Sequence, residues 1–209
     1  SPTISLTGTT SGYRYNIGND IELDDSVSIN ASNSGTFVFN GALTGSGGLT
    51  RTSTFSTLIL AGNNSYAGPT TISAGTLQIG NDGASGTLGS GAVSIASGAT
   101  LRIDRSGVVD VPNDISGAGA LFIHGPAMTD VVSLSGNNSF TGSVSIGSGS
   151  LRITDAAQLG EGAKSITATS ATSALRLDGS AGAVVLPEQF AIATSNPNGA
   201  IFNEAGDNE

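Results

Sequence analysis

Apolar residues recur at every second position in short runs along most of the chain, and glycine or asparagine separates one run from the next. TTISAGTLQI (70–79), AVSIASGATLRI (92–103) and SVSIGSGSLRI (143–153) each predict a strand of three to five residues, a corner and a second strand. No segment keeps a 3.6-residue apolar period, and DAAQLGEGA (155–163) comes nearest to a helical turn. The pattern predicts an all-β protein whose inward side chains include Ile72, Leu77, Ile79, Ile95, Leu101, Ile103, Ile146, Leu151, Ile153, Leu175 and Leu177.

The chain repeats itself at long range. LAGNNSYAG (60–68) returns as LSGNNSFTG (134–142), so Leu60 corresponds to Leu134. Upstream, LTGSGGL (43–49) returns as ISGAGAL (115–121), and downstream Leu88 corresponds to Leu159. The offset between corresponding positions changes little from one match to the next, so the repeat keeps its period closely.

Short strands, tight corners and a long internal period together predict a right-handed parallel β-helix, a single-stranded solenoid. Coils of roughly 20 to 25 residues would place about three coils in each period of 71–74 residues. We expect residues 1–209 to form one continuous segment with repeat-like copies at 58–103 and 132–178. An antiparallel sandwich would also explain the alternation, but it does not explain the long repeat.

Residues 58–103 resemble the autotransporter-associated β-strand repeat, also called the passenger-associated transport repeat. The resemblance lies in the Gly-Asn-Asn-x-Tyr/Phe-x-Gly corner, the following strand, and the Ala-Gly-Thr-Leu turn, and residues 132–154 are a second copy. It implies a passenger segment of a type V secreted, adhesin-like protein at the cell surface or outside a Gram-negative bacterium. It also implies a scaffold and secretion-supporting role, with neighbouring coils and an outer-membrane translocator as partners.

Composition narrows the classes of partner. The chain has 7 Lys and Arg against 16 Asp and Glu, a formal net charge of −9, and a pI near 4.3. Nucleic acid is not expected as a partner, because binding phosphates requires clustered basic residues. The chain has no cysteine, so we expect no disulfide scaffold.

The repeated Gly-Asn-Asn segments are interpreted as structural corners, because glycine and asparagine tolerate left-handed backbone conformations. Tyr66 and Phe140 replace each other in the two copies and are interpreted as plugs of the core. The predicted corner residues are Gly62, Asn63, Asn64, Gly136, Asn137 and Asn138.

Catalytic and metal sites have little support in the sequence. His124 is the single histidine and precedes Gly125-Pro126, so it is interpreted as a turn residue rather than a general base. With one histidine and no cysteine we expect no transition-metal site and no cofactor. A weak Ca²⁺ site near Asp24 and Asp25 remains an alternative.

Three arginines recur in LRID, LRIT and LRLD, at Arg102, Arg152 and Arg176. Alternation with inward leucine and isoleucine points them outward, where they form either a basic binding stripe or solvated surface positions. In the second interpretation Arg102 pairs with Asp104 and Arg176 pairs with Asp178. Each of these surface ion pairs would contribute about 0–1 kcal/mol to the stability of the fold.

Three functions stay open, and the first is a structural, secretion-supporting stalk segment. The alternative is direct adhesion to host glycan, matrix or neighbouring cells through Tyr13, Arg14 and Tyr15 of GYRYN. A polysaccharide-active enzyme needs clustered carboxylates, and the sequence does not point to them, so we expect no enzyme. Uncovered end coils would leave open sheet edges, which predicts end-to-end self-association.

Overall fold

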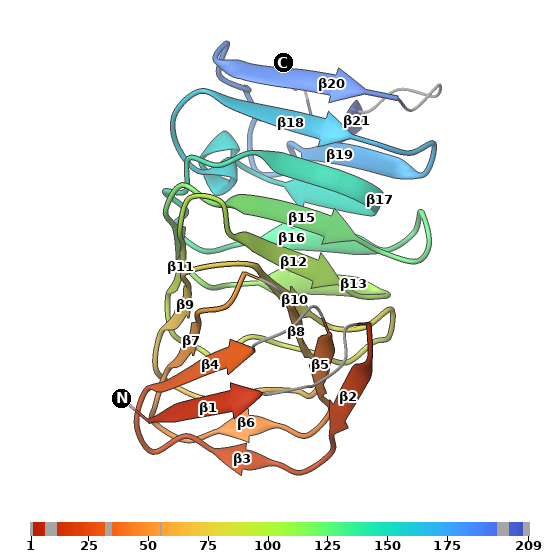
Figure 1. Cartoon of the computed structure of the whole chain (residues 1–209). Helices are drawn as coiled ribbons and strands as arrows, with labels where there is room; N and C mark the ends of the chain where they lie inside the picture. The colour runs from red at the N-terminus through yellow and green to blue at the C-terminus, as the bar shows by residue number, and fades with distance from the viewer. Residues whose placement is uncertain (1, 7–11, 32–34, 55, 196–200, 207–209) are drawn as a thin grey trace.

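The computed structural model describes residues 2–6, 12–31, 35–54, 56–195 and 201–206 of the 209-residue chain. The chain winds into a β-solenoid of about eight turns, with its two ends at opposite ends of the stack (Figure 1). In the described part, every paired strand runs parallel to its neighbours. The predicted parallel β-helix is confirmed.

Each coil presents strands on up to three faces. The first face consists of β1 (Thr3–Leu6), β4 (Val27–Ala31), β7 (Leu49–Arg51), β9 (Thr70–Ile72), β11 (Val93–Ile95) and β14 (Ile115–Ser116). The second face consists of β2 (Arg14–Ile17), β5 (Thr36–Phe39), β8 (Thr57–Leu60), β10 (Thr76–Ile79), β12 (Thr100–Asp104), β15 (Ala120–His124), the first part of β17 (Val144–Ile153), β18 (Lys164–Ala168) and β20 (Phe190–Thr194). The third face consists of β3 (Ile21–Glu22), β6 (Leu43–Thr44), β13 (Val108–Val111), β16 (Val131–Leu134), the second part of β17, β19 (Ser173–Asp178) and β21 (Ile201–Ala205).

The segment nearest to a helical turn in the sequence does form one, the 3₁₀ helix η1 (Ala156–Leu159). The Asp155 side chain accepts a hydrogen bond from the Ala157 amide and so caps its first turn. Among the described residues no helix has the length and apolarity needed to cross a membrane.

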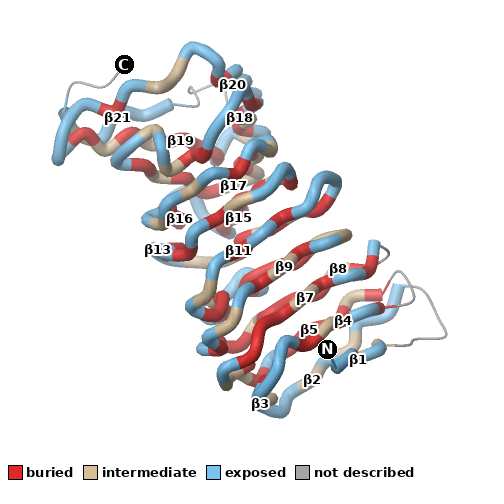
Figure 2. Tube along the Cα trace, turned by 90° about the vertical axis from the view of Figure 1, so that its left-hand side faces the viewer, coloured by how far each residue is buried: buried red, intermediate tan, exposed pale blue. Residues whose placement is uncertain are grey.

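The core is a set of vertical columns of apolar side chains. On the second face Leu58, Leu77, Leu101 and Leu121 are direct partners in successive strands, and Val144 continues their column. These side chains are at most 1% exposed. Figure 2 shows buried positions repeating along each coil of the stack. The eleven inward residues predicted from alternation are all buried, as expected for period-two strands.

Coil length varies along the stack. On the second face the shortest step between paired residues runs from Thr57 to Thr76, and the longest runs from Ile166 to Ile192. Because the coils differ in length, a sequence repeat of fixed period does not have to return to the same face.

The two repeat copies do lie on different faces. In the first copy β8, β9 and β10 lie on the second, first and second faces, in that order. In the second copy β16 lies on the third face, and β17 runs from the second face to the third. Three turns separate β8 from β15 on the second face, and β16 follows one face later. The second copy is therefore rotated by one face relative to the first.

One detail of the predicted strand pattern is wrong. We expect two strands around a corner in residues 143–153, but β17 is one continuous strand of ten residues. Its ladder partners change from β15 and β18 to β16 and β19 between Ile146 and Gly149. Gly149 has a positive φ of 69°, so a glycine bends this strand around the edge of the solenoid without ending it.

The third face is interrupted in the first half of the molecule. After β6, the next two coils pass this face as the irregular segments 61–69 and 80–92, and strands resume with β13. Within the described residues β13 pairs with β16 alone, so its other edge faces the segment 80–92.

Candidate functional site

The predicted corner residues serve coil stacking, for a different reason from the one expected. Gly62 and Gly136 have no Cβ, and an added Cβ would lie 2.3 Å from the Gly41 oxygen and 2.1 Å from the Asn113 oxygen. Glycine is thus required because adjacent coils approach closely. None of the six residues Gly62, Asn63, Asn64, Gly136, Asn137 and Asn138 has a positive φ, so the left-handed conformations expected from the sequence are absent there.

The Asn64 side chain connects three successive coils. Its Oδ1 accepts a hydrogen bond from the Leu43 amide of the coil before (2.7 Å), and its Nδ2 donates to the Thr87 oxygen of the coil after (2.6 Å). Asn64 is buried, so these bonds satisfy polar groups that water does not reach.

Asn138 makes the equivalent pair of contacts in the second copy. Its Oδ1 accepts from the Ile115 amide (2.9 Å), and its Nδ2 donates to the Gln158 oxygen (2.8 Å). The side chain of the first asparagine in each pair makes fewer of these hydrogen bonds between coils. Asn63 accepts from the Gly86 amide (3.1 Å), and Asn137 donates from its backbone amide to Asp114 (2.7 Å).

Tyr66 and Phe140 are completely buried. The Tyr66 hydroxyl and the Thr70 hydroxyl are 2.7 Å apart, and burial raises the pKa of Tyr66. Phe140 lies under the ammonium group of Lys164, which is 4.0 Å from the ring centroid.

Lys164 is a buried cation with backbone partners. Its Nζ donates to the Phe140 oxygen (2.7 Å) and to the Leu159 oxygen at the end of η1. Burial lowers the pKa of Lys164 to about 8, although Glu161 opposes the shift. The lysine therefore joins the coil of Phe140 to the next coil.

The GYRYN segment lies in the first coil. Tyr13 is 59% exposed and Arg14 is exposed, whereas the Tyr15 ring stacks on Phe37 at 4.9 Å. Arg14, Tyr15 and Phe37 line a shallow hollow of about 530 Å³. Tyr15 is thus partly committed to packing, and Tyr13 and Arg14 are the members that solvent reaches.

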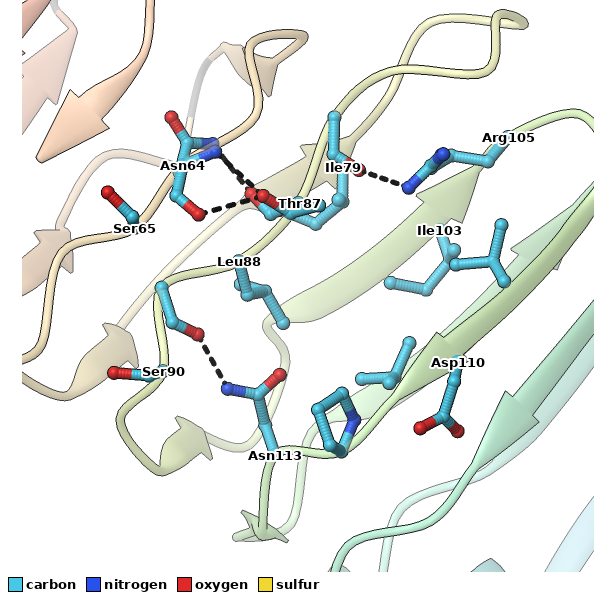
Figure 3. Close-up of a pocket in the computed structure, with 15 residues that line it drawn as sticks. Asn64, Ser65, Ile79, Thr87, Leu88, Ser90, Ile103, Arg105, Asp110 and Asn113 are labelled. Atoms are coloured by element: carbon cyan, nitrogen blue, oxygen red, sulfur yellow. Dashed lines mark hydrogen bonds between the residues drawn. The ribbon is translucent and has the colours of Figure 1, made fainter.

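A pocket of about 430 Å³ opens where the third face is interrupted (Figure 3). Segment 86–90 forms one wall and β13 with Pro112 and Asn113 forms another, while Arg105 closes one end by donating to the Gly86 oxygen (2.8 Å). Its apolar lining comes from Ile79, Leu88, Ile103, Val109, Val111 and Pro112.

Beside the same loop, Asp82, Asp104 and His124 converge from three successive coils. His124 Nδ1 lies 3.1 Å from Asp104 Oδ1 and 3.6 Å from Asp82 Oδ1. His124 therefore ends a strand next to carboxylates, and the interpretation as an ordinary turn residue is incomplete. Asp24 and Asp25 belong to no comparable group of three ligands among the described residues.

The recurring arginines make individual ion pairs. Arg102 binds Asp104 (2.6 Å) as predicted, but Asp104 is only 3% exposed and does not lie on a solvated surface. Arg176 binds Glu204 (2.7 Å), and Asp178 lies 3.9 Å from Arg152. The predicted pairing of Arg176 with Asp178 is wrong, because the neighbouring coil supplies a closer carboxylate.

Two features escaped the sequence analysis. Arg51 is completely buried in a column between Ile29 and Ile72, and the L-T-R alternation of β7 already pointed it inward. The ligand cluster could have been found from its intervals of 22 and 20 residues, which are one coil each.

Comparisons with known proteins agree with the resemblance. The profile described as passenger-associated-transport-repeat matches residues 56–79 and 129–153. The Adhesin BmaC autotransporter of Brucella suis biovar 1 (strain 1330) is 32% identical over 142 residues, which is 63% of this chain and 4% of that protein. The chain thus spans only a small part of the length of this relative. No solved structure matches the chain.

Proposed function

From the premise that this chain carries autotransporter passenger repeats and lies at the surface or outside of a Gram-negative cell, we propose that it is a structural, secretion-supporting stalk segment. The observation that carries the proposal is the continuous stack of coils, each of which buries its apolar side chains against the one before. Repeat architectures of this kind gain stability by nearest-neighbour stacking.

The secretion step follows from that architecture. A chain that emerges from a translocator forms coils one after another, and each new coil buries its apolar residues and pairs its backbone with an existing edge. Unfolding would have to precede return through the pore, so stacking opposes backward movement. Asn64 and Asn138 support this role because each joins three coils through one side chain.

The proposal is tested with the chain fused to an autotransporter translocator and displayed on cells. Gly136→Ala is the disrupting variant, since its Cβ would overlap the Asn113 oxygen. Gly18→Ala is the control, because no described residue lies within 4 Å of a Cβ added at that position. We expect Gly136→Ala to lower the amount of protease-accessible passenger at the surface, and Gly18→Ala to leave it unchanged. Normal display of a Gly136→Ala passenger whose isolated fold is clearly weakened would overturn the secretion-supporting role.

Direct adhesion is the second candidate, favoured by the exposure of Tyr13 and Arg14 beside the hollow in the first coil. Tyr13→Ala is the suitable variant, because Tyr15 stacks on Phe37 and its loss would also disturb packing. Binding of the chain to a glycan array, lost in Tyr13→Ala and kept in the exposed control Met128→Ala, would favour adhesion. No binding by the unmodified chain would favour the stalk.

We propose no enzymatic activity, since repeats of this kind are not typically enzymatic.

A further inference from the structure

Three side chains with metal-binding atoms meet at one edge of the second face. Asp104 ends β12 and His124 ends β15, and the two are direct partners in the parallel ladder. Asp82 lies in the turn after β10, one coil earlier. Their ligand atoms all lie within 4.8 Å of one another.

The spacing of these atoms suits a small divalent ion. A tetrahedral zinc ion with bonds of about 2.1 Å holds its ligand atoms about 3.4 Å apart. His124 Nδ1 is 3.1 Å from Asp104 Oδ1 and 3.6 Å from Asp82 Oδ1, so the two distances bracket that value. The donor set of one imidazole nitrogen and two carboxylate oxygens favours zinc over calcium or magnesium, which prefer oxygen ligands throughout.

Neighbouring groups orient the central carboxylate. Arg102 donates from Nε (2.9 Å) and Nη2 (2.6 Å) to Asp104 Oδ2, which leaves Oδ1 directed toward His124 and Asp82. The guanidinium is itself held over the Phe122 ring, 4.8 Å from its centroid. Such outer contacts fix the orientation of metal ligands in proteins.

We propose that Asp82, Asp104 and His124 form a Zn²⁺ site with three protein ligands and a fourth position open to solvent. Asp82 and His124 keep 65% and 29% of their side chains exposed, which provides the entry path, whereas Asp104 is 4% exposed and anchors the site. Bound zinc would hold the turn at Asp82 against the two following coils. Arg105 already ties the same turn to the stack through the Gly86 oxygen, so zinc would stiffen one wall of the adjacent pocket.

Isothermal titration of the metal-stripped full chain with ZnCl₂ tests the site. We expect one ion per chain, with affinity reduced by about tenfold or more in Asp82→Asn and in His124→Gln. Asn tolerates the positive φ of 62° at position 82, so Asp82→Asn removes the charge without straining the turn. Asp24→Asn/Asp25→Asn removes two carboxylates elsewhere and should bind zinc as the unmodified chain does.

The nitrogen resonances of His124 give a second, direct readout, because the chain has a single histidine and no cysteine. Zinc should shift the Nδ1 signal in the unmodified chain and leave it in place in Asp82→Asn at the same concentration. Three results would overturn the proposal: no binding below about 1 mM zinc, unchanged affinity in His124→Gln, or equal affinity for Ca²⁺.

Discussion

Asn64 and Asn138 make the same two inter-coil hydrogen bonds, although they lie on different faces of the solenoid. In each, the side-chain oxygen accepts from a backbone amide of the preceding coil, at 2.7 and 2.9 Å, and the nitrogen donates to a carbonyl of the following coil, at 2.6 and 2.8 Å. The repeat therefore preserves a contact between coils and does not preserve a position around the axis.

Asn138→Ala should lower the free energy of unfolding by about 1–3 kcal/mol, because it leaves the Ile115 amide and the Gln158 carbonyl without their partner. Chemical denaturation followed by circular dichroism measures the change. Asn137→Ala is the matched control at the neighbouring exposed position and should stay within about 0.5 kcal/mol. Equal effects at the two positions would contradict the assigned bridge.

Gly136→Ala should destabilise the isolated chain by about 1–3 kcal/mol or more, because its Cβ would lie 2.1 Å from the Asn113 oxygen and must push two coils apart. At Gly18 the added Cβ has no atom of the described part of the chain within 4 Å, so Gly18→Ala should change stability by less than about 0.5 kcal/mol. Thermal melting of both variants decides the point. A tolerated Gly136→Ala would mean that the coils are not closely stacked there.

The stability of the chain should rise with pH between about 8 and 10 because of Lys164. Burial lowers the pKa of this lysine in the folded state to about 8, from 10.5 for the free side chain. Between these values the unfolded chain binds more protons than the folded one, so the free energy of unfolding increases with pH. Below about pH 8 both states are protonated and the cost of burying the charge is fully present.

Lys164→Met isolates this contribution, since Lys164 is the single lysine in the sequence. Urea unfolding at pH 7, 8, 9 and 10 should show a smaller rise in the variant than in the unmodified chain. Parallel pH profiles for the two proteins would rule out a depressed lysine pKa.

Arg51→Met should leave stability unchanged or raise it by about 1 kcal/mol, in contrast to most core substitutions. Arg51 lies in an apolar column, where its Nη2 donates to the backbone oxygen and the hydroxyl of Ser56. Its Nε and Nη1 have no hydrogen-bond partner among the described residues, and burial lowers its pKa to about 10. Arg152→Met, at an arginine with a 38% exposed side chain, provides the comparison. A loss of more than about 1 kcal/mol in Arg51→Met would show that the buried charge is compensated.

Local pattern was sufficient to identify the strands and their inward side chains. Ile72, Leu77 and Ile79 alternate with polar residues, and an extended chain sends alternate side chains to opposite sides whatever its neighbours are. The same rule pointed Arg51 inward, although an arginine there was not expected. The reason for Gly62 could not be found in this way, since it depends on the distance to Gly41 in another coil.

The sequence by itself determined a parallel β-solenoid with a long repeat, because alternation and corner residues act over a few residues and repeat similarity needs no coordinates. Tertiary structure alone decided which coils bring distant residues together. Unequal coil lengths set the stacking register. The combined length of the coils between the two repeat copies places the second copy one face further around the solenoid than the first. The same register brought the ligand atoms of Asp82, Asp104 and His124 within 4.8 Å of one another. This proximity depends on the length of every intervening turn.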